Sequence, residues 1–268
     1  MSVSYRIGIC SQLDHAPLLA QAGADHIEPA FGVVAAMESE AYARGVDALK
    51  RSGLCVDSMN SMLPGTTALY GTMDQTDELM DFVRRGMDRA AELGCRNVIF
   101  GSGTARRIPP GHRLRVAQLR IATLLDRFCN IARPYGIRIA IEPLRAQETN
   151  FIHTLDDAAQ IIALLPHCNN LGITADIYHM LEGNENFSAL GAVGDKLFHV
   201  HVCAPDRHFP RPQRPVEDGD IYRSFFCALN AAGYDGTVSI EAIAQNLSEE
   251  CAPALHIIRE AARAAAAR

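Results

Sequence analysis

The chain alternates short runs of β-branched and apolar residues with longer segments in which apolar residues recur at helical spacing. This alternation continues along all 268 residues and predicts repeated β-α units that build a parallel sheet. The count of units and the length together favour one (β/α)8 barrel, a single domain over residues 1–268. The expected strands are residues 6–10, 25–28, 54–58, 96–100, 136–142, 171–176, 197–202 and 237–241.

Helical periodicity is clearest in residues 77–93, 113–133, 155–165, 221–231 and 248–267. Gly94, Gly136 and Gly233 come just after predicted helix ends, where a left-handed cap favours glycine. No stretch with the composition of a linker divides the chain.

The last four predicted strands alternate polar with apolar residues, and each alternation ends on a residue that can bind a metal. Side chains alternate between the two faces of a strand, so the apolar set faces the helices and the polar set faces the barrel interior. Barrels of this type hold their active sites at the carboxyl ends of the strands. By this parity, four successive strands deliver to that mouth Glu142, Asp176, His201 and Glu241.

Three carboxylates and one imidazole at one place repel each other and lose hydration unless a cation is present. An oxygen-rich set with one nitrogen and no thiolate favours Mn²⁺ or Mg²⁺, with Co²⁺ or Zn²⁺ as alternatives. The sequence therefore predicts one divalent metal ion, held by Glu142, Asp176, His201 and Glu241.

Several segments resemble the xylose-isomerase-like barrels of the sugar phosphate isomerase/epimerase superfamily, with the D-tagatose 3-epimerase branch as the nearest mechanistic model. They are residues 141–144 (IEPL), 148–150 (ETN), 176–179 (DIYH), 199–201 (HVH) with Arg207, and 239–241 (SIE). The resemblance implies a metal held by the four residues named above. It also implies that the substrate is held by Glu148, His179 and Arg207.

The expected chemistry is proton transfer on a small keto-sugar or polyol. A metal that binds a ketose carbonyl and the adjacent hydroxyl acidifies the neighbouring C–H by stabilising an enediolate. Glu142 and Glu241 would then act as the catalytic acid and base, one removing the proton and the other returning it. Return to the same carbon gives an epimerase, and return to the adjacent carbon gives a ketose-aldose isomerase.

Other reactions on the same barrel remain open. A metal-dependent dehydratase of the inosose or 3-dehydroshikimate type would use the same enolate to expel a hydroxyl group. An endonuclease IV-like nuclease is less favoured, because it needs further inward histidines on the early strands and a basic face. The last alternative is a non-catalytic binding barrel.

Some nearby residues allow more than one interpretation. We expect His199 to be buried and hydrogen-bonded, and Glu28 either faces the site or forms a structural ion pair. The Gly-Ser-Gly turn at 101–103 could cradle an anion through its backbone N–H groups, although such a segment is more often only a turn. Arginines after the fourth, fifth and seventh strands suggest an anionic group on the substrate, unless they only reflect an arginine-rich chain: Arg106, Arg107, Arg145, Arg207, Arg211 and Arg214.

Composition excludes several classes of partner. The net charge of −6 gives no attraction toward nucleic acid or an anionic membrane. The eight cysteines contain no C-x-x-C pair and no secretory or membrane-spanning run accompanies them, so we expect a reduced, cytoplasmic protein. The 25 basic residues include only two lysines, Lys50 and Lys196, and neither is placed for Schiff-base chemistry. The sequence leaves open whether the protein forms a homo-oligomer.

Overall fold

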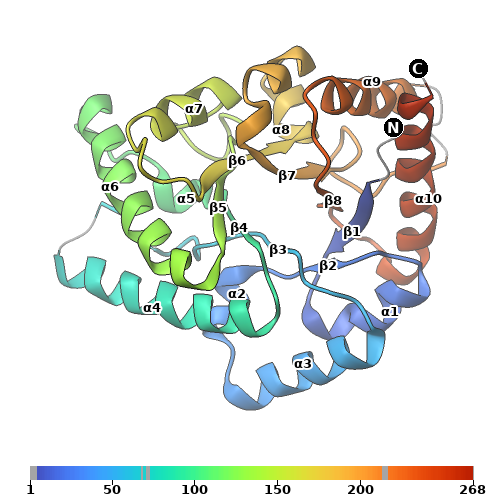
Figure 1. Ribbon diagram of the computed structural model, residues 1–268, viewed down its shortest axis with the longest axis horizontal. Helices are drawn as coiled ribbons and strands as arrows, with labels where there is room; N and C mark the ends of the chain where they lie inside the picture. The colour runs from blue at the N-terminus through green and yellow to red at the C-terminus, as the bar shows by residue number, and fades with distance from the viewer. Residues whose placement is uncertain (1–4, 68, 71–72, 213–216, 268) are drawn as a thin grey trace.

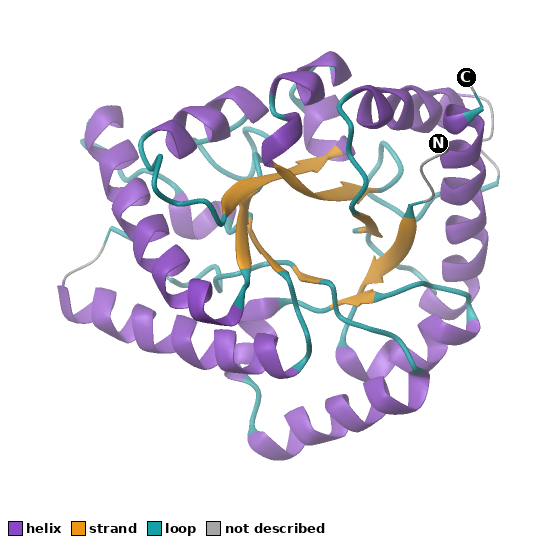
Figure 2. Ribbon diagram, in the orientation of Figure 1, coloured by secondary structure: helices purple, strands orange, loops and turns teal. Residues whose placement is uncertain are grey.

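The strands of the computed structural model, which describes residues 5–67, 69–70, 73–212 and 217–267, form one eight-stranded parallel sheet. The strand order is β2-β1-β8-β7-β6-β5-β4-β3. Isolated bridges from His26 to Cys55 and from Ala30 to Asn60 join β2 to β3 and bring the ring close to closure. Helices surround the sheet on its outside (Figures 1 and 2). The predicted (β/α)8 barrel is confirmed.

The strands lie close to the predicted positions, with one exception. Residues 54–58 were expected as the third strand, but only Ser58 and Met59 pair with the fourth. The preceding segment contributes a single bridge at Cys55, and Asp57 there makes an ion pair with Arg6 at 2.6 Å. The strands are β1 (Arg6–Cys10), β2 (Ile27–Glu28), β3 (Ser58–Met59), β4 (Asn97–Phe100), β5 (Arg138–Ile141), β6 (Leu171–Asp176), β7 (Leu197–Val202) and β8 (Thr237–Ile240).

Ten α-helices lie among the described residues, and the five predicted helical segments each coincide with one of them. Gly94, Gly136 and Gly233 have φ of 78°, 69° and 73°, so each occupies the left-handed region that favours glycine. The helices are α1 (Ala16–Gln21), α2 (Phe31–Ala36), α3 (Ser39–Ser52), α4 (Met73–Glu92), α5 (Gly103–Arg106), α6 (Leu114–Ala132), α7 (Leu155–Ala163), α8 (Ile177–Glu182), α9 (Glu217–Ala231) and α10 (Leu247–Ala266). Short 3₁₀ helices are η1 (Leu13–His15), η2 (Arg133–Tyr135), η3 (Phe187–Ala192) and η4 (Gly194–Lys196).

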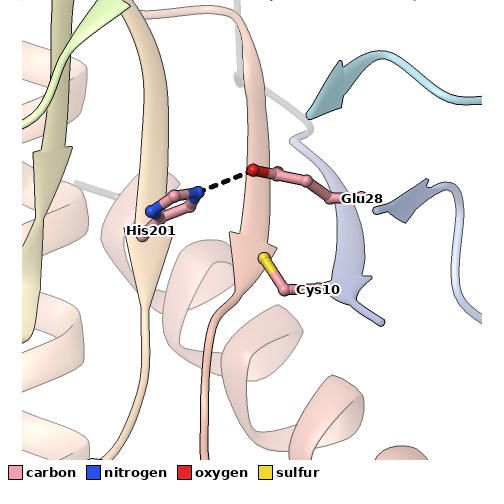
Figure 3. Close-up of side chains that lie close together, drawn as sticks. All are labelled: Cys10, Glu28 and His201. Carbon is pink, nitrogen blue, oxygen red and sulfur yellow. Dashed lines mark hydrogen bonds and ion pairs between the residues drawn. The ribbon is translucent and has the colours of Figure 1, made fainter. Parts of the chain in front are cut away.

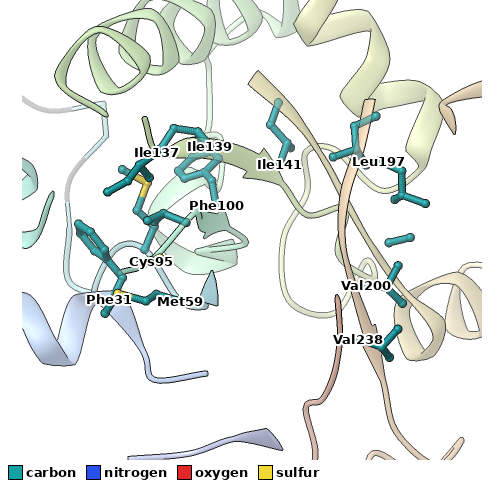
Figure 4. Packing of buried hydrophobic residues seen from close by; sticks show 14 of the residues in the cluster. Phe31, Met59, Cys95, Phe100, Ile137, Ile139, Ile141, Leu197, Val200 and Val238 are labelled. Atoms are coloured by element: carbon teal, nitrogen blue, oxygen red, sulfur yellow. The ribbon is translucent and has the colours of Figure 1, made fainter. Parts of the chain in front are cut away.

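The hydrophobic core lies between the outer face of the barrel and the helices. Ile139 and Ile141 of β5 are fully buried there, as are Val200 of β7 and Val238 of β8 (Figure 4). Burial of one such side chain contributes ~1.5–3 kcal/mol relative to its exposure. The next residues along β7 and β8, His201 and Ser239, are buried as well but are polar, so on these strands the predicted parity separates an apolar outer layer from a polar barrel interior. On β5 the residue between the two isoleucines is the small, apolar Ala140.

Both lysines lie away from the carboxyl ends of the strands. Lys50 is exposed near the end of α3, and Lys196 comes directly before β7 begins. All eight cysteines are described and carry free thiols. Within the described ranges, no helix has both the length and the apolar character needed to cross a membrane.

Candidate active site

Four side chains from successive strands converge at the mouth of the barrel, as the sequence predicts. Asp176 is the last residue of β6 and His201 lies near the end of β7, while Glu142 and Glu241 directly follow β5 and β8. Each offers one nitrogen or oxygen atom, and these atoms all lie within 4.8 Å of one another. Glu142, Asp176 and His201 are buried, and the Glu241 side chain is 21% exposed.

The orientation of the His201 ring fits a cation among the carboxylates. Its Nε2 lies 2.9 Å from Oε1 of Glu28 (Figure 3). Its Nδ1 lies 2.8 Å from Oε1 of Glu142 and 3.6 Å from Oε2 of Glu241. When Nε2 donates its proton to Glu28, the lone pair of Nδ1 points at carboxylate oxygens. In that neutral form a metal ion has to lie between Nδ1 and the carboxylates. Without a metal, a second proton on Nδ1 makes the bond to Glu142, and this exchange of a proton for an ion is what a metal-binding histidine requires.

The carboxylates of the site are buried close together and repel each other. Burial, together with the neighbouring Glu241 carboxylate, raises the pKa of Asp176 to about 6. Burial and Glu241 also raise the pKa of Glu142. For His201, burial is outweighed by Glu28, Glu241 and Glu142, whose charges raise its pKa well above its usual range. The site thus carries more negative charge than one imidazolium can balance, which favours an added cation.

Glu28 is a buried ion-pair partner that reaches the site through His201. Its second oxygen, Oε2, lies 2.7 Å from Nε2 of His199 and accepts a hydrogen bond from Ser58 at 2.6 Å. Although burial opposes it, the charges of His199 and His201 hold the pKa of Glu28 well below its usual range. Of the two interpretations of Glu28, the structure supports the ion pair. The prediction that His199 is buried and hydrogen-bonded is confirmed.

Cys10 completes the surroundings of this ion pair from β1. Its Sγ lies within 4.8 Å of a ligand atom of both Glu28 and His201 (Figure 3). Burial, followed by the charge of Glu28, raises the pKa of the Cys10 thiol well above its usual range. The thiol therefore stays neutral beside the ion pair.

Asn60 is a site residue that sequence reasoning missed. Its Nδ2 donates a 2.9 Å hydrogen bond to Oε1 of Glu241 and so orients that carboxylate from the opposite side of the barrel. An asparagine after a short strand has no distinctive sequence pattern, and its role becomes visible only when the barrel brings β3 across from β8.

The three residues expected to hold substrate line one pocket of about 180 Å³ together with Glu142 and Glu241. Arg207 forms an ion pair with Glu148. The backbone N–H of Arg145 donates to Nδ1 of His179 at 3.3 Å, so the His179 proton resides on Nε2. That Nε2 is buried and has no hydrogen-bond partner among the described residues, and burial lowers the pKa of this histidine. A neutral imidazole thus presents an unused N–H donor to the pocket.

Comparison with known proteins shows the family of this chain. Its sequence matches the family described as the xylose isomerase-like TIM barrel over residues 16–267. The chain belongs to that family. The resemblance seen in the sequence is thereby confirmed.

Curated relatives of this xylose isomerase-like barrel include sugar epimerases. A ketose 3-epimerase from Arthrobacter globiformis is 28% identical over 173 residues, which cover 62% of this chain and 56% of that protein. A fructoselysine 3-epimerase from Escherichia coli O157:H7 is 23% identical over 181 residues, which cover 68% of this chain and 65% of that protein. The alignments therefore span between half and two thirds of the length of these relatives.

Solved structures share the fold over nearly the whole chain. A 3-keto-D-glucoside 4-epimerase from Escherichia coli, in its apo form, has a TM-score of 0.76 at 20% identity, covering 98% of this chain and 100% of that chain. A D-allulose 3-epimerase from Methylomonas sp., in complex with D-allulose, has a TM-score of 0.79 at 20% identity, covering 96% and 97%.

In this xylose isomerase-like barrel, each described arginine of the expected anion-binding set is bound to oxygen atoms of the protein. Arg106 is fully buried and donates to the backbone carbonyls of Phe100 and Ile152, each at 3.2 Å. Arg145 pairs with Glu148 and Glu182. The remaining described members are bound to protein oxygens as well, Arg107 to Gln147, Arg207 to Glu148 and Arg211 to Asp206. Arg214 lies outside the described residues.

The Gly-Ser-Gly turn packs against the carboxylate of Glu142. A Cβ atom at Gly101 would lie 2.3 Å from Oε2 of Glu142, so glycine lets this carboxylate keep its position. Ser102 accepts a 2.9 Å hydrogen bond from the backbone N–H of Leu63. Ser61, Ser102 and Arg207 all line the pocket with positive φ, of 49°, 40° and 64°. Such conformations cost energy in non-glycine residues and gather at functional sites.

One inward histidine on an early strand was not expected. His26 is fully buried, and its Nε2 lies 2.9 Å from Oγ of Ser239. Burial, reinforced by the charge of His199, lowers its pKa to about 4. Within the described part of the chain, His26 belongs to no cluster that could hold a metal, so it does not revive the nuclease alternative.

Proposed function

We propose that this protein is a metal-dependent sugar epimerase or isomerase that transfers a proton on a keto-sugar through an enediolate. The observation that carries the proposal is the placement of Glu142 and Glu241. Both lie within reach of Nδ1 of His201 and line the same pocket, one buried and one open toward solvent. Two carboxylates so placed can act as base and acid on one substrate carbon.

Glu142, Asp176, His201 and Glu241 would hold a divalent ion, Mn²⁺ or Mg²⁺ by their donor chemistry. The ion would polarise the carbonyl of an α-hydroxyketone and so acidify the adjacent C–H. One glutamate removes that proton and the other supplies a proton from the opposite side. Burial raises the pKa of Glu142 and so favours its protonated form. A carboxyl group with a raised pKa can both donate and accept a proton during the reaction.

The other pocket residues fix the substrate. Nε2–H of His179 has no protein acceptor and can donate to the substrate oxygen on which negative charge develops. Arg207 and Glu148, joined in an ion pair, offer a donor and an acceptor for sugar hydroxyls. Buried, preset donors lower the barrier without reorganisation during the reaction.

The relatives support an epimerase rather than a dehydratase. The names of those compared above describe 3-epimerases and a 4-epimerase of ketoses and of substituted keto-sugars. The dehydratase alternative uses the same carboxylates but gives a different product. Analysis of the product therefore distinguishes it from the epimerase.

The test is solvent hydrogen exchange. Incubation with ketoses and keto-glycosides in D₂O is expected to place deuterium on the carbon next to the carbonyl in the recovered sugar. Glu142→Gln and Glu241→Gln should each lose this exchange, because both keep the shape of the side chain and lose its basicity. Glu260→Gln, which changes a glutamate on α10 paired with Arg263, is the matched control. An unsaturated product would favour the dehydratase, and retention of more than about a tenth of the exchange by either variant would assign the base elsewhere.

A further inference from the structure

A groove opens beside the pocket of the catalytic glutamates, over the seam between β2 and β3. It has a volume of about 620 Å³. Val33, Ala36 and Met37 line it from α2 and the residue after it, while Leu63, Pro64 and Gly65 line it from the segment after β3. Its described lining includes no charged side chain. The lining is mainly apolar, so a molecule bound there gains free energy mainly by covering apolar atoms.

The groove and the catalytic pocket share part of their wall. Ser61, Leu63 and Gly65 line both of them. The two spaces therefore lie side by side, and a substituent that passes Leu63 on a molecule held between Glu142 and Glu241 would reach the groove.

The sizes of the two spaces indicate where a substituent would go. The catalytic pocket holds only about 180 Å³, which is below the ~300–1,000 Å³ typical of ligand sites. The groove is more than three times larger, at about 620 Å³. The pocket suits a sugar ring or chain, and the groove adds the room for a group attached to it.

The two walls of the groove, α2 and the segment after β3, are packed tightly against each other. Gly32 in the first turn of α2 packs so closely on the 61–64 segment that a Cβ there would lie 3.1 Å from the Ser61 carbonyl oxygen and 3.3 Å from Cδ of Pro64. The backbone N–H of Gly32 donates to that same carbonyl at 3.1 Å. Phe31 and Val34 anchor α2 in the core, while Val33 between them is 54% exposed. A preformed apolar surface of this kind binds without an ordering cost.

The charges near the groove also favour an uncharged, apolar substituent. The described arginines near the mouth are bound to protein carboxylates or carbonyls, and the groove has no basic side chain, so an anionic substituent would meet no free partner there. We propose that the groove is a subsite for an apolar substituent, such as an alkyl or aryl aglycone, carried by the keto-sugar substrate. This inference rests on the proposed function of the adjoining pocket.

The test compares two substrates that differ only in the substituent. Deuterium exchange is measured with the methyl and the hexyl 3-keto-D-glucosides. Each buried CH₂ is worth ~0.8 kcal/mol and each ~1.4 kcal/mol is tenfold, so burial of about two of the added CH₂ groups should raise kcat/KM roughly tenfold for the hexyl substrate. Val33→Asp should bring the hexyl-to-methyl ratio of kcat/KM close to one, because it places a charge in the groove.

Val116→Asp is the matched control, since Val116 on α6 is 55% exposed and lines neither space. It should keep the wild-type ratio. Equal kcat/KM for the two glycosides, or a ratio that survives Val33→Asp, would overturn the subsite while leaving the proposed function intact. A dimer seen by sedimentation that Val33→Asp dissociates would also overturn it, because the groove would then be a subunit contact. Exchange with no ketose, free or substituted, would reject the proposed function itself.

Discussion

Nε2 of His201 lies 2.9 Å from the buried carboxylate of Glu28, so the ring is oriented from behind by an ion pair. A partner in this position fixes the tautomer and the direction of a metal-binding histidine. Glu28→Gln should therefore weaken Mn²⁺ binding by about 10–100-fold, as loss of such partners usually does. Titration calorimetry of the metal-free protein checks this, with Glu260→Gln as control. Unchanged affinity would show that Glu28 serves the fold alone.

Asp176→Asn should remove most of the bound metal. The asparagine keeps the side-chain oxygen that accepts from the backbone N–H of Tyr178, 2.6 Å away in the wild type, but it removes one of three negative charges. Elemental analysis after dialysis should find about one Mn²⁺ per wild-type chain and far less in the variant. A variant that retains full occupancy would place the ion elsewhere. Chelator treatment of the wild type should stop deuterium exchange, and added Mn²⁺ should restore it.

Gly101→Ala should impair the reaction more than the fold. The new methyl group would lie 2.3 Å from Oε2 of Glu142, so the carboxylate has to move. Because a displacement of ~1 Å at a catalytic group can cost on the order of 100-fold, we expect kcat to fall by tenfold or more. Gly191→Ala, where a Cβ meets nothing within 4 Å, is the control. Equal kcat in the two variants would contradict the close contact.

His26 should make the protein sensitive to mild acid. Its pKa is near 6.5 in the unfolded chain and is lowered to about 4 by burial in the folded one. The unfolded state therefore takes up a proton first as pH falls, so this contribution to stability is present above about 6.5 and is lost as the pH falls toward about 4. The loss is at most ~1.4 kcal/mol per pH unit.

Urea unfolding across this pH range measures the effect. His26→Gln should show a shallower loss of unfolding free energy with falling pH than the wild type. The control is His256→Gln, which changes an exposed histidine of α10 and should keep the wild-type slope. Identical slopes for the wild type and His26→Gln would mean that other groups dominate the acid response.

Where a strand has strict alternation, the sequence predicted the structure well. Residues 171–176 and 197–202 form strands with the predicted bounds, because the alternation of residue types along them indicates both their extent and the side that faces inward. The same parity predicted that Asp176 and His201 would meet at the barrel mouth. The bounds of these strands and the direction of their side chains follow from the local sequence pattern, once the strands are assumed to form a closed barrel.

Features that depend on packing between distant segments were harder to predict. Residues 54–58 carry no clear alternation, so the third strand was placed too early along the chain. The contact of Asn60 with Glu241 joins residues 181 positions apart. Arg106 illustrates the same limit, because only the folded chain shows that carbonyls surround this arginine instead of solvent or substrate.

The two lysines have a practical consequence for handling the protein. Lys50 projects from α3, and Lys196 lies where β7 begins, at the opposite end of the barrel from Glu142 and Glu241. Coupling chemistry directed at lysine amines, to a resin, a sensor surface or a fluorophore, would attach at the flank or the base of the barrel. The protein would then be tethered with the mouth of the barrel facing the solution, and no lysine would have to be replaced beforehand.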